Sequence, residues 1–287
     1  MDERKKEKKK TRLVDLHVHI GPEPIERKYR ARELSILAAR ESAIFGTKNH
    51  FFPTAYLTEG LPGLVGSIVL NESVGGLNPS AVYSAASVFR DPIIVWMPTI
   101  SATTNRSPGL VPKEWGRNSL PRNARETLLR ISPLEKSGKL SENAKRTLDA
   151  VLETRGILAT GHLGFREAKA VVEFASDIGI RKIIATHPMY GPQGFSLEEM
   201  RELSGKCFVE ISASMETIDG IPAGELRKVI DYVGTRRCIL TSDYGQVKSP
   251  DPVSGIFSFA RRLGLGGTSL RKLSLENPMK LIKGGKA

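Results

Sequence analysis

Eight short apolar runs, each as long as a β-strand, constrain the fold of this chain more than any other feature of its sequence. They cover residues 13–20, 43–51, 65–71, 92–99, 156–163, 181–188, 207–214 and 238–245, and amphipathic helical patterns separate most of them. Strands that alternate with helices predict βα units and a parallel sheet. Eight strands are the number that closes a barrel. We therefore predict an α/β fold, a (β/α)8 barrel of the TIM type.

One interval, residues 100–155, is too long for a simple βα unit. It separates the fourth and fifth predicted strands and begins with a polar, irregular stretch, which two predicted helices near 123–130 and 141–154 follow. Because the interval follows a strand, we interpret it as an insertion that partly covers the C-terminal face of the barrel, where active sites form. An external excursion without contact to the site is the alternative. We expect 13–287 to form a single domain that includes this insertion.

The first twelve residues hold seven basic and three acidic side chains, and we expect them to form a disordered basic tail. The whole chain has 43 Lys and Arg against 31 Asp and Glu, a formal net charge of +12. We interpret this charge as solubilising, with a nucleic-acid or anionic-substrate role as the alternative. The tail lacks the apolar region of a secretory signal, and no run of about 18 apolar residues occurs. We therefore expect a cytoplasmic protein with no membrane span, and leave open whether it forms a homo-oligomer.

All five histidines of the chain fall within, or at the C-terminal end of, a predicted strand. They are His17, His19, His50, His162 and His187. The C-terminal ends of parallel strands share one face of a barrel, so these imidazoles are expected to converge. His17 and His19 are two residues apart and therefore point to the same side of their strand.

An aspartate, Asp243, follows the eighth predicted strand and completes a set of metal-ligand residue types. The set contains His17, His19, His162, His187 and Asp243. Four imidazoles and one carboxylate suit Zn²⁺, and also Mn²⁺, Fe²⁺, Co²⁺ or Ni²⁺, but not a calcium site made of oxygen ligands. Such an ion would lower the pKa of a bound water, and Asp243 would then transfer its proton.

Several other residues could contribute to the same site. Lys48 and His50 are again two residues apart; His50 could bind the metal or the substrate. Lys48 could be carboxylated and bridge two ions, pair with an anion, or be a solvated charge at the rim. Asp15 could accept a hydrogen bond from an imidazole, be a third carboxylate in the core of the barrel mouth, or be a polar group bonded to backbone inside the barrel. Glu72 and Glu210 are further candidates, and Glu210 should be paired if it is buried.

The order of these residues, H-x-H on the first strand, His on the fifth and sixth and Asp on the eighth, resembles the amidohydrolase superfamily of metal-dependent hydrolases. The segments "KNHFFPT" and "VLNESVGGLNP" are similar to an uncharacterised branch of predicted hydrolases within it, and "LSLENPMKLI" resembles the start of its last helix. The resemblance extends over nearly the whole chain after the tail.

The resemblance implies that His17, His19 and Asp243 hold a first metal ion. His162 and His187 would hold a second ion, or else His162 would join the first while His187 orients the water. The superfamily often places a bridging carboxylated lysine or a glutamate at the end of the fourth strand, but here that strand ends in "WMPT". This departure favours a single ion over two.

These observations predict a metal-dependent hydrolase, in which a metal-bound water attacks a small-molecule amide, cyclic amide, lactone or ester. Asp243 and His187 are the candidate catalytic residues. A metal-dependent nuclease or phosphoesterase is an alternative that the net charge suggests, although no basic patch with interleaved aromatic residues supports it. The pattern also leaves open a decarboxylase or hydratase on the same scaffold, and a non-enzymatic metal-binding barrel.

Overall fold

The computed structural model describes residues 10–89, 92–106 and 131–283. Within them, two parallel sheets carry the strands. The first sheet contains β1 (Leu13–His19), β2 (Ala43–Lys48) and β3 (Leu64–Val65). The second contains β4 (Ser67–Val69), β5 (Ile94–Trp96), β6 (Ile157–Ala159), β7 (Ile183–Ala185), β8 (Phe208–Ser212) and β9 (Cys238–Thr241), paired in sequence order. Every predicted apolar run contains at least one strand, so the α/β fold with parallel strands is confirmed.

The two sheets adjoin each other at both edges. Gly66 is the single residue between β3 and β4. On the other side, the Asp243 amide donates to the His17 carbonyl over 2.9 Å, and the His19 amide donates to the Tyr244 carbonyl over 2.7 Å. These bonds place the C-terminal end of β1 beside the end of β9. The strand pairing itself forms two sheets, and closure into one continuous barrel stays a prediction.

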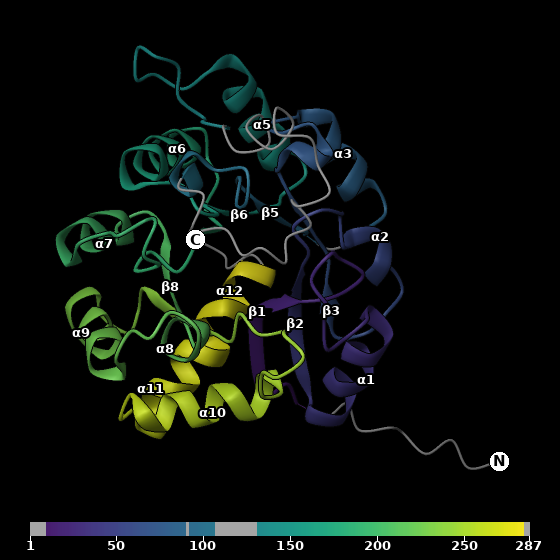
Figure 1. Cartoon of the computed structure of the whole chain (residues 1–287), viewed down its shortest axis with the longest axis vertical. Helices are drawn as coiled ribbons and strands as arrows, with labels where there is room; N and C mark the ends of the chain where they lie inside the picture. Colours follow the sequence, from purple (N-terminus) through teal and green to yellow (C-terminus); the bar gives the residue numbers. More distant parts are fainter. Residues whose placement is uncertain (1–9, 90–91, 107–130, 284–287) are drawn as a thin grey trace.

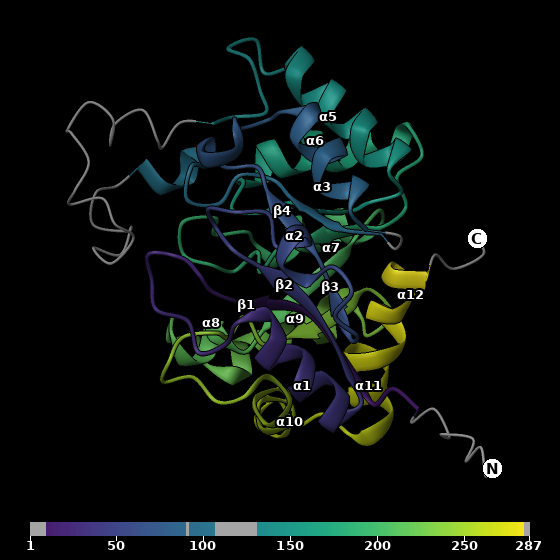
Figure 2. The same cartoon turned by 90° about the vertical axis from the view of Figure 1, so that its right-hand side faces the viewer.

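Helices surround the strands (Figure 1). They are α1 (Ala31–Glu41), α2 (Ala55–Thr58), α3 (Pro79–Ser87), α5 (Glu142–Glu153), α6 (Phe165–Asp177), α7 (Leu197–Ser204), α8 (Ser214–Thr217), α9 (Ala223–Val233), α10 (Pro252–Arg262), α11 (Gly267–Arg271) and α12 (Asn277–Lys283). Figure 2 shows α1 and α10 on one side of the strands, and α3, α5 and α6 on the opposite side. Short 3-10 turns at Glu72–Val74 and Thr103–Arg106 and a π-helical turn at Lys272–Glu276 complete the described elements.

Local sequence explains where several helices begin. The side chain of Asn78 accepts from the Ser80 amide, and Pro79 occupies the first helical position of α3. Ser196 accepts from the Glu199 amide while the Glu199 carboxylate accepts from the Ser196 amide, a capping box at the start of α7. Each arrangement satisfies amide groups that the first turn of a helix leaves without a partner.

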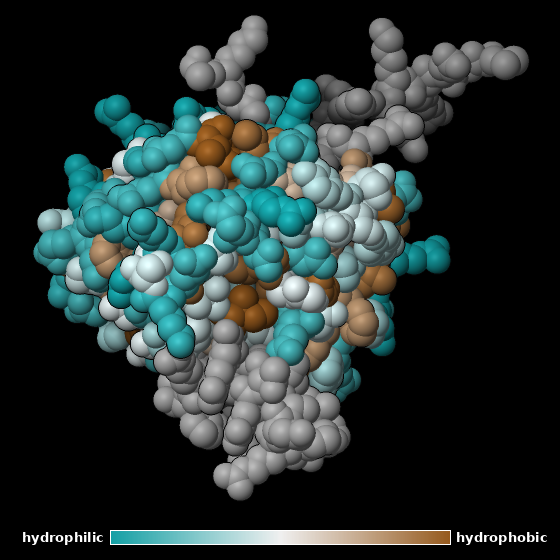
Figure 3. Space-filling view, turned by 90° about the horizontal axis from the view of Figure 1, so that it is seen from above, coloured by the Kyte–Doolittle hydropathy of each residue, from teal (hydrophilic) through white to brown (hydrophobic). Residues whose placement is uncertain are grey.

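The space between the strands is filled by apolar side chains from both sheets. Val14, Leu16, Val65, Val69, Ile94, Trp96, Ile157, Ala159, Ile184, Phe208, Ile239 and Leu281 of α12 form one buried cluster. A second, larger cluster lies between the strands and the surrounding helices. Figure 3 shows that the face seen from above is mainly hydrophilic, with small hydrophobic groups between polar ones. Apolar side chains therefore fill the interior between the strands. A site that binds a ligand is expected at the ends of the strands, beyond this apolar cluster.

The long interval after the fourth predicted strand is described only in part. The predicted helix at 141–154 is present as α5, Glu142–Glu153. The predicted helix at 123–130 and most of the basic tail lie outside the described residues. No helix in the described part of the chain is both long and apolar enough to span a membrane.

Candidate metal centre

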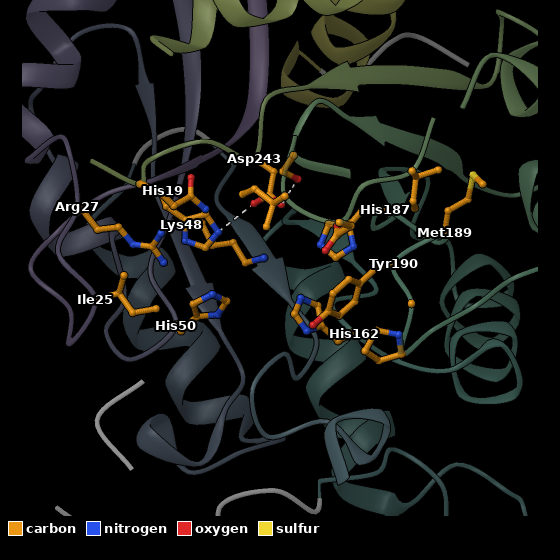
Figure 4. A pocket seen from close by; sticks show the side chains of 17 residues that line it. His19, Ile25, Arg27, Lys48, His50, His162, His187, Met189, Tyr190 and Asp243 are labelled. Carbon is orange, nitrogen blue, oxygen red and sulfur yellow. Dashed lines mark hydrogen bonds and ion pairs between the residues drawn. The ribbon is translucent and has the colours of Figure 1, made fainter. Parts of the chain in front are cut away.

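The predicted ligands come together at the C-terminal ends of the strands. Four of them, His19, His162, His187 and Asp243, line one cavity of about 640 Å³, and Figure 4 shows their side chains around a common space. His17 is completely buried beside this cavity and contacts Asp243 directly. The convergence follows from the fold, because β1, β6, β7 and β9 all end on the same face.

Three of these residues form the tightest cluster. Nε2 of His17 lies 2.9 Å from Oδ1 of Asp243, and Nε2 of His19 lies 3.0 Å from the same oxygen. One ligand atom from each residue falls within 4.8 Å of the others, which no other set of histidine, cysteine or acidic residues achieves in the described part of the chain. Nδ1 of His19 is buried without a hydrogen-bond partner among the described residues. Two imidazoles directed at one carboxylate oxygen fit a borderline-soft divalent cation such as Zn²⁺.

His162 and His187 lie on the other side of the cavity. The centroid of the His187 ring is 5.6 Å from that of His17 and 5.1 Å from that of His162. Nδ1 of His187 is 3.2 Å from Oε1 of Gln193. Burial lowers the pKa of both rings below the usual value, that of His162 well below, so they are neutral and able to act as ligands near pH 7. The structure brings them to the site but not into the three-residue cluster, and their ligand roles stay predictions.

A buried carboxylate, Glu210 of β8, contacts the ring nitrogen of His17 that does not approach Asp243. Oε1 of Glu210 lies 2.8 Å from Nδ1 of His17 and accepts from the Thr241 hydroxyl over 2.7 Å. Oε2 accepts from the His187 amide over 3.0 Å. Burial alone would raise the pKa of Glu210, but His17, His187 and the Thr241 hydroxyl together hold this pKa below its usual value. The expectation that Glu210 is paired is confirmed, and the pairing directs Nε2 of His17 toward Asp243, where a metal would lie.

We expect Glu210→Gln to weaken Zn²⁺ binding about 10-fold to 100-fold, because the amide keeps the shape of the carboxylate but removes the charge that orients and polarises His17. The measurement is competition for Zn²⁺ against a chelator of known affinity. Glu225→Gln, at a surface position of α9, is the control. An unchanged affinity in a folded Glu210→Gln protein would contradict the role of Glu210.

The other oxygen of Asp243 is held by a residue that sequence reasoning missed. The hydroxyl of Ser214 donates to Oδ2 of Asp243 over 2.7 Å, and lies 2.8 Å from the Ser212 hydroxyl. Asp243 itself has a φ of 52°, in the left-handed region. Burial alone would raise its pKa, but His17 and His19 hold it well below the usual value. The only sequence signal for Ser214 was its place at the C-terminal end of the predicted apolar run 207–214.

The hydrogen bonds of Asp15 show which of its predicted roles the structure supports. Its Oδ1 accepts from the amides of His17 and Ser242, each over 3.1 Å, and its Oδ2 accepts from the Ser242 hydroxyl over 2.5 Å. It therefore bonds to backbone and to a hydroxyl, and the interpretation as the acceptor of an imidazole hydrogen is wrong. Burial raises the pKa of Asp15 to about 7.

Lys48 lies inside the site. Its Nζ is 2.9 Å from Nε2 of His17 and 4.4 Å from the centroid of the Trp96 ring. The residue is 1% exposed, so the interpretation as a solvated rim charge is wrong. Burial lowers the pKa of Lys48 to about 8.

The last two candidates, His50 and Glu72, lie in different parts of the molecule. His50 lines the cavity, and its Nδ1 lies 2.9 Å from the Thr99 hydroxyl. Glu72 is instead at the start of a 3-10 turn and lines a different surface hollow, with Gly76 and Ile131. The structure therefore does not bring Glu72 to the predicted site.

Most of the cavity wall comes from irregular segments that sequence reasoning did not identify. Its further lining residues are Ile25, Arg27, Met189, Tyr190, Gly191, Pro192, Ile218, Asp219, Ile221 and Gln246. They follow β1, β7, β8 and β9, where no periodic pattern says which way a side chain points.

Comparisons with known proteins identify the family of the chain and show which solved structures share its fold. A model of the family described as "Family of unknown function (DUF6282)" matches residues 12–210. No curated protein sequence matches the chain. Among solved structures, one assigned as a 2-pyrone-4,6-dicarboxylic acid hydrolase from Pseudomonas putida has a TM-score of 0.53 at 16% identity, over 94% of this chain and 96% of that one.

Two other solved structures are similar over nearly their whole length. An amidohydrolase from Pseudomonas aeruginosa has a TM-score of 0.56 at 11% identity, over 94% of this chain and 95% of that one. A variant organophosphorus hydrolase from Deinococcus radiodurans has a TM-score of 0.51 at 12% identity, over 94% and 92%. The resemblance to amidohydrolases is thereby confirmed as a likeness of fold.

Proposed function

The chain belongs to the DUF6282 family, and on this premise we propose that it is a metal-dependent hydrolase of small-molecule amides, cyclic amides, lactones or esters. The observation that carries the proposal is the convergence of His17 Nε2 and His19 Nε2 on one oxygen of Asp243, at 2.9 and 3.0 Å. The fold supports it, since the similar solved structures include an amidohydrolase and a pyrone dicarboxylic acid hydrolase. We further propose that the two sheets function as one (β/α)8 barrel.

In this proposal His17, His19 and Asp243 hold one divalent cation, by preference zinc, with manganese, iron, cobalt or nickel as alternatives. Such an ion supplies a water of lowered pKa and polarises the scissile bond. His162 and His187 would hold a second ion, or else His162 would join the first ion while His187 orients the water.

The residues of the chain perform the proton chemistry. Oδ1 of Asp243 faces the two imidazoles, whereas Oδ2 faces Ser214, so Oδ2 is the oxygen available to take a proton from the attacking water. Asp243 then returns that proton to the leaving nitrogen or oxygen. In the arrangement with a single ion, His187 at the opposite side of the cavity would orient the water.

Removal of metal tests the proposal directly. We expect the purified protein to contain close to one divalent ion per chain by elemental analysis, and chelation to abolish hydrolysis of a panel of lactones, cyclic amides and esters. Addition of Zn²⁺ should restore it, because the water is activated only next to the ion. Undiminished hydrolysis in protein shown to be free of metal would contradict the proposal.

A further inference from the structure

Arg27 lines the cavity although its side chain is only 3% exposed. Its Nε and Nη2 both contact one oxygen of Glu23, Oε1. No hydrogen bond joins its Nη1 to another described residue. Figure 4 shows the guanidinium directed toward the space between His50 and Lys48. One edge of this planar group is therefore occupied and the other edge faces the cavity.

Glu23 keeps the guanidinium in this orientation. Its second oxygen, Oε2, accepts from the His50 amide over 3.0 Å, so backbone fixes the carboxylate. An arginine whose rotamer is fixed in this way loses little conformational entropy when its other edge binds a planar oxyanion.

Beside Arg27, one side-chain atom of a neighbouring residue has no hydrogen-bond partner. Arg27 and Gln246 form an antiparallel bridge, and both line the cavity. Oε1 of Gln246 is buried without a hydrogen-bond partner among the described residues. A buried amide oxygen without a donor costs free energy unless something binds to it. This wall therefore offers a guanidinium edge and, beside it, an acceptor.

The charges around the cavity limit the kind of anion. The lining cations are Arg27 and Lys48, and Lys48 is already engaged by His17 and Trp96. Two acidic residues, Asp219 and Asp243, also line the cavity, so its lining cations and acids are equal in number. A single guanidinium edge suits a carboxylate better than a doubly charged phosphate.

The rest of the wall is apolar. Ile25, Met189, Pro192, Ile218 and Ile221 contribute apolar side chains around the same cavity, and the centroid of the Tyr190 ring lies 5.0 Å from that of His162. Ligand cavities of this kind hold an apolar body with a few polar groups that orient it.

We propose that the free edge of Arg27 binds a carboxylate of the substrate, that Oε1 of Gln246 accepts an adjacent N–H or O–H, and that the apolar wall holds the body of the molecule. The substrate is then a small amphipathic carboxylic acid that also carries the hydrolysable bond. This inference rests on the proposed function, because the hydrolysable bond must reach the metal centre. It assigns the substrate class of that site.

Two hydroxamic acids of equal length test the inference by calorimetry on the Zn²⁺-loaded protein. Succinic acid monohydroxamate ends in a carboxylate, whereas butyrohydroxamic acid ends in a methyl group, and both share the metal-binding head. We expect the carboxylate ligand to bind about tenfold more tightly, as a charge-assisted hydrogen bond predicts. Arg27→Met should abolish this preference.

Arg27→Lys provides the sharper comparison. It keeps a positive charge beside Glu23, so it avoids the buried unpaired carboxylate that Arg27→Met leaves, but it removes the planar guanidinium edge and should reduce the preference for the carboxylate ligand. Arg40→Met, at an exposed arginine paired with Glu41, is the matched control and should leave the ratio unchanged.

The outcomes separate the two proposals. If both hydroxamates bind the wild-type protein with equal affinity, or if Arg27→Met and Arg27→Lys both keep the wild-type preference, Arg27 does not bind a carboxylate and the inference is wrong. If neither hydroxamate binds the Zn²⁺-loaded protein, the proposed metal centre fails, and the inference fails with it.

Discussion

Asp243→Ala should lower kcat/KM for hydrolysis by roughly 10³-fold or more, because the variant loses both a metal ligand and the group that accepts the proton. His17→Ala should lose a comparable amount, since Nε2 of His17 and Nε2 of His19 both approach the same Asp243 oxygen. In both proteins, elemental analysis should find bound metal well below the wild-type ratio. A parallel loss of metal and of turnover in both variants would assign these residues to the metal centre.

Two further variants make this prediction specific. Asp243→Asn should retain part of the metal, because its amide oxygen can still coordinate, but remain inactive, because the amide cannot take up the proton. Asp231→Ala, at an exposed position of α9 where the carboxylate pairs with Arg227, should match the wild type in both measurements. Wild-type metal content together with wild-type turnover in both His17→Ala and Asp243→Ala would rule out the metal centre.

The strands could be predicted from sequence because each needs only a local signal. A run of apolar residues must be buried on both faces in a parallel sheet, and the histidines and Asp243 at the ends of such runs had to share one face. That reasoning needs no knowledge of which strand pairs with which. It was enough to bring every predicted ligand to one end of the strands, whereas Glu72 failed because a turn after β4 carries it away from the cavity.

Hydrogen bonds and ion pairs between side chains of different strands could not be predicted from local sequence signals. The sequence shows that Glu210 must be paired if buried, but its partner depends on how β8 lies relative to β1 and β9. Arg27 is a stronger example, since it lies in an irregular segment where no periodicity fixes the direction of a side chain. Its pairing with Glu23, four residues earlier, looks from sequence like an ordinary surface ion pair, and only the fold shows that both are buried.

The turn before His162 depends on glycine. Gly161 has a φ of +59°, and a Cβ at this position would lie 2.2 Å from the carbonyl oxygen of Met97 and 2.6 Å from that of Pro98. Both oxygens belong to backbone at the end of β5, so no side-chain rotation relieves the contact. The Gly161 amide also donates to the Thr186 hydroxyl over 3.0 Å, which ties this turn to the residue before His187.

We therefore expect Gly161→Ala to lower the free energy of unfolding by about 4 kcal/mol, from left-handed backbone strain and overpacking combined. Gly60→Ala is the matched control: its φ is +71°, with nothing within 4 Å of an added Cβ. It should cost only about 1 kcal/mol, the strain without the contact. Urea unfolding of both variants measures the difference in the free energy of unfolding. Equal decreases in the two variants would show that the turn can shift away from the Met97 and Pro98 carbonyls, and would contradict this prediction. If enough Gly161→Ala protein folds, its Zn²⁺ affinity tests whether His162 is a ligand. The affinity should fall if it is, because the displaced turn moves this imidazole away from Asp243.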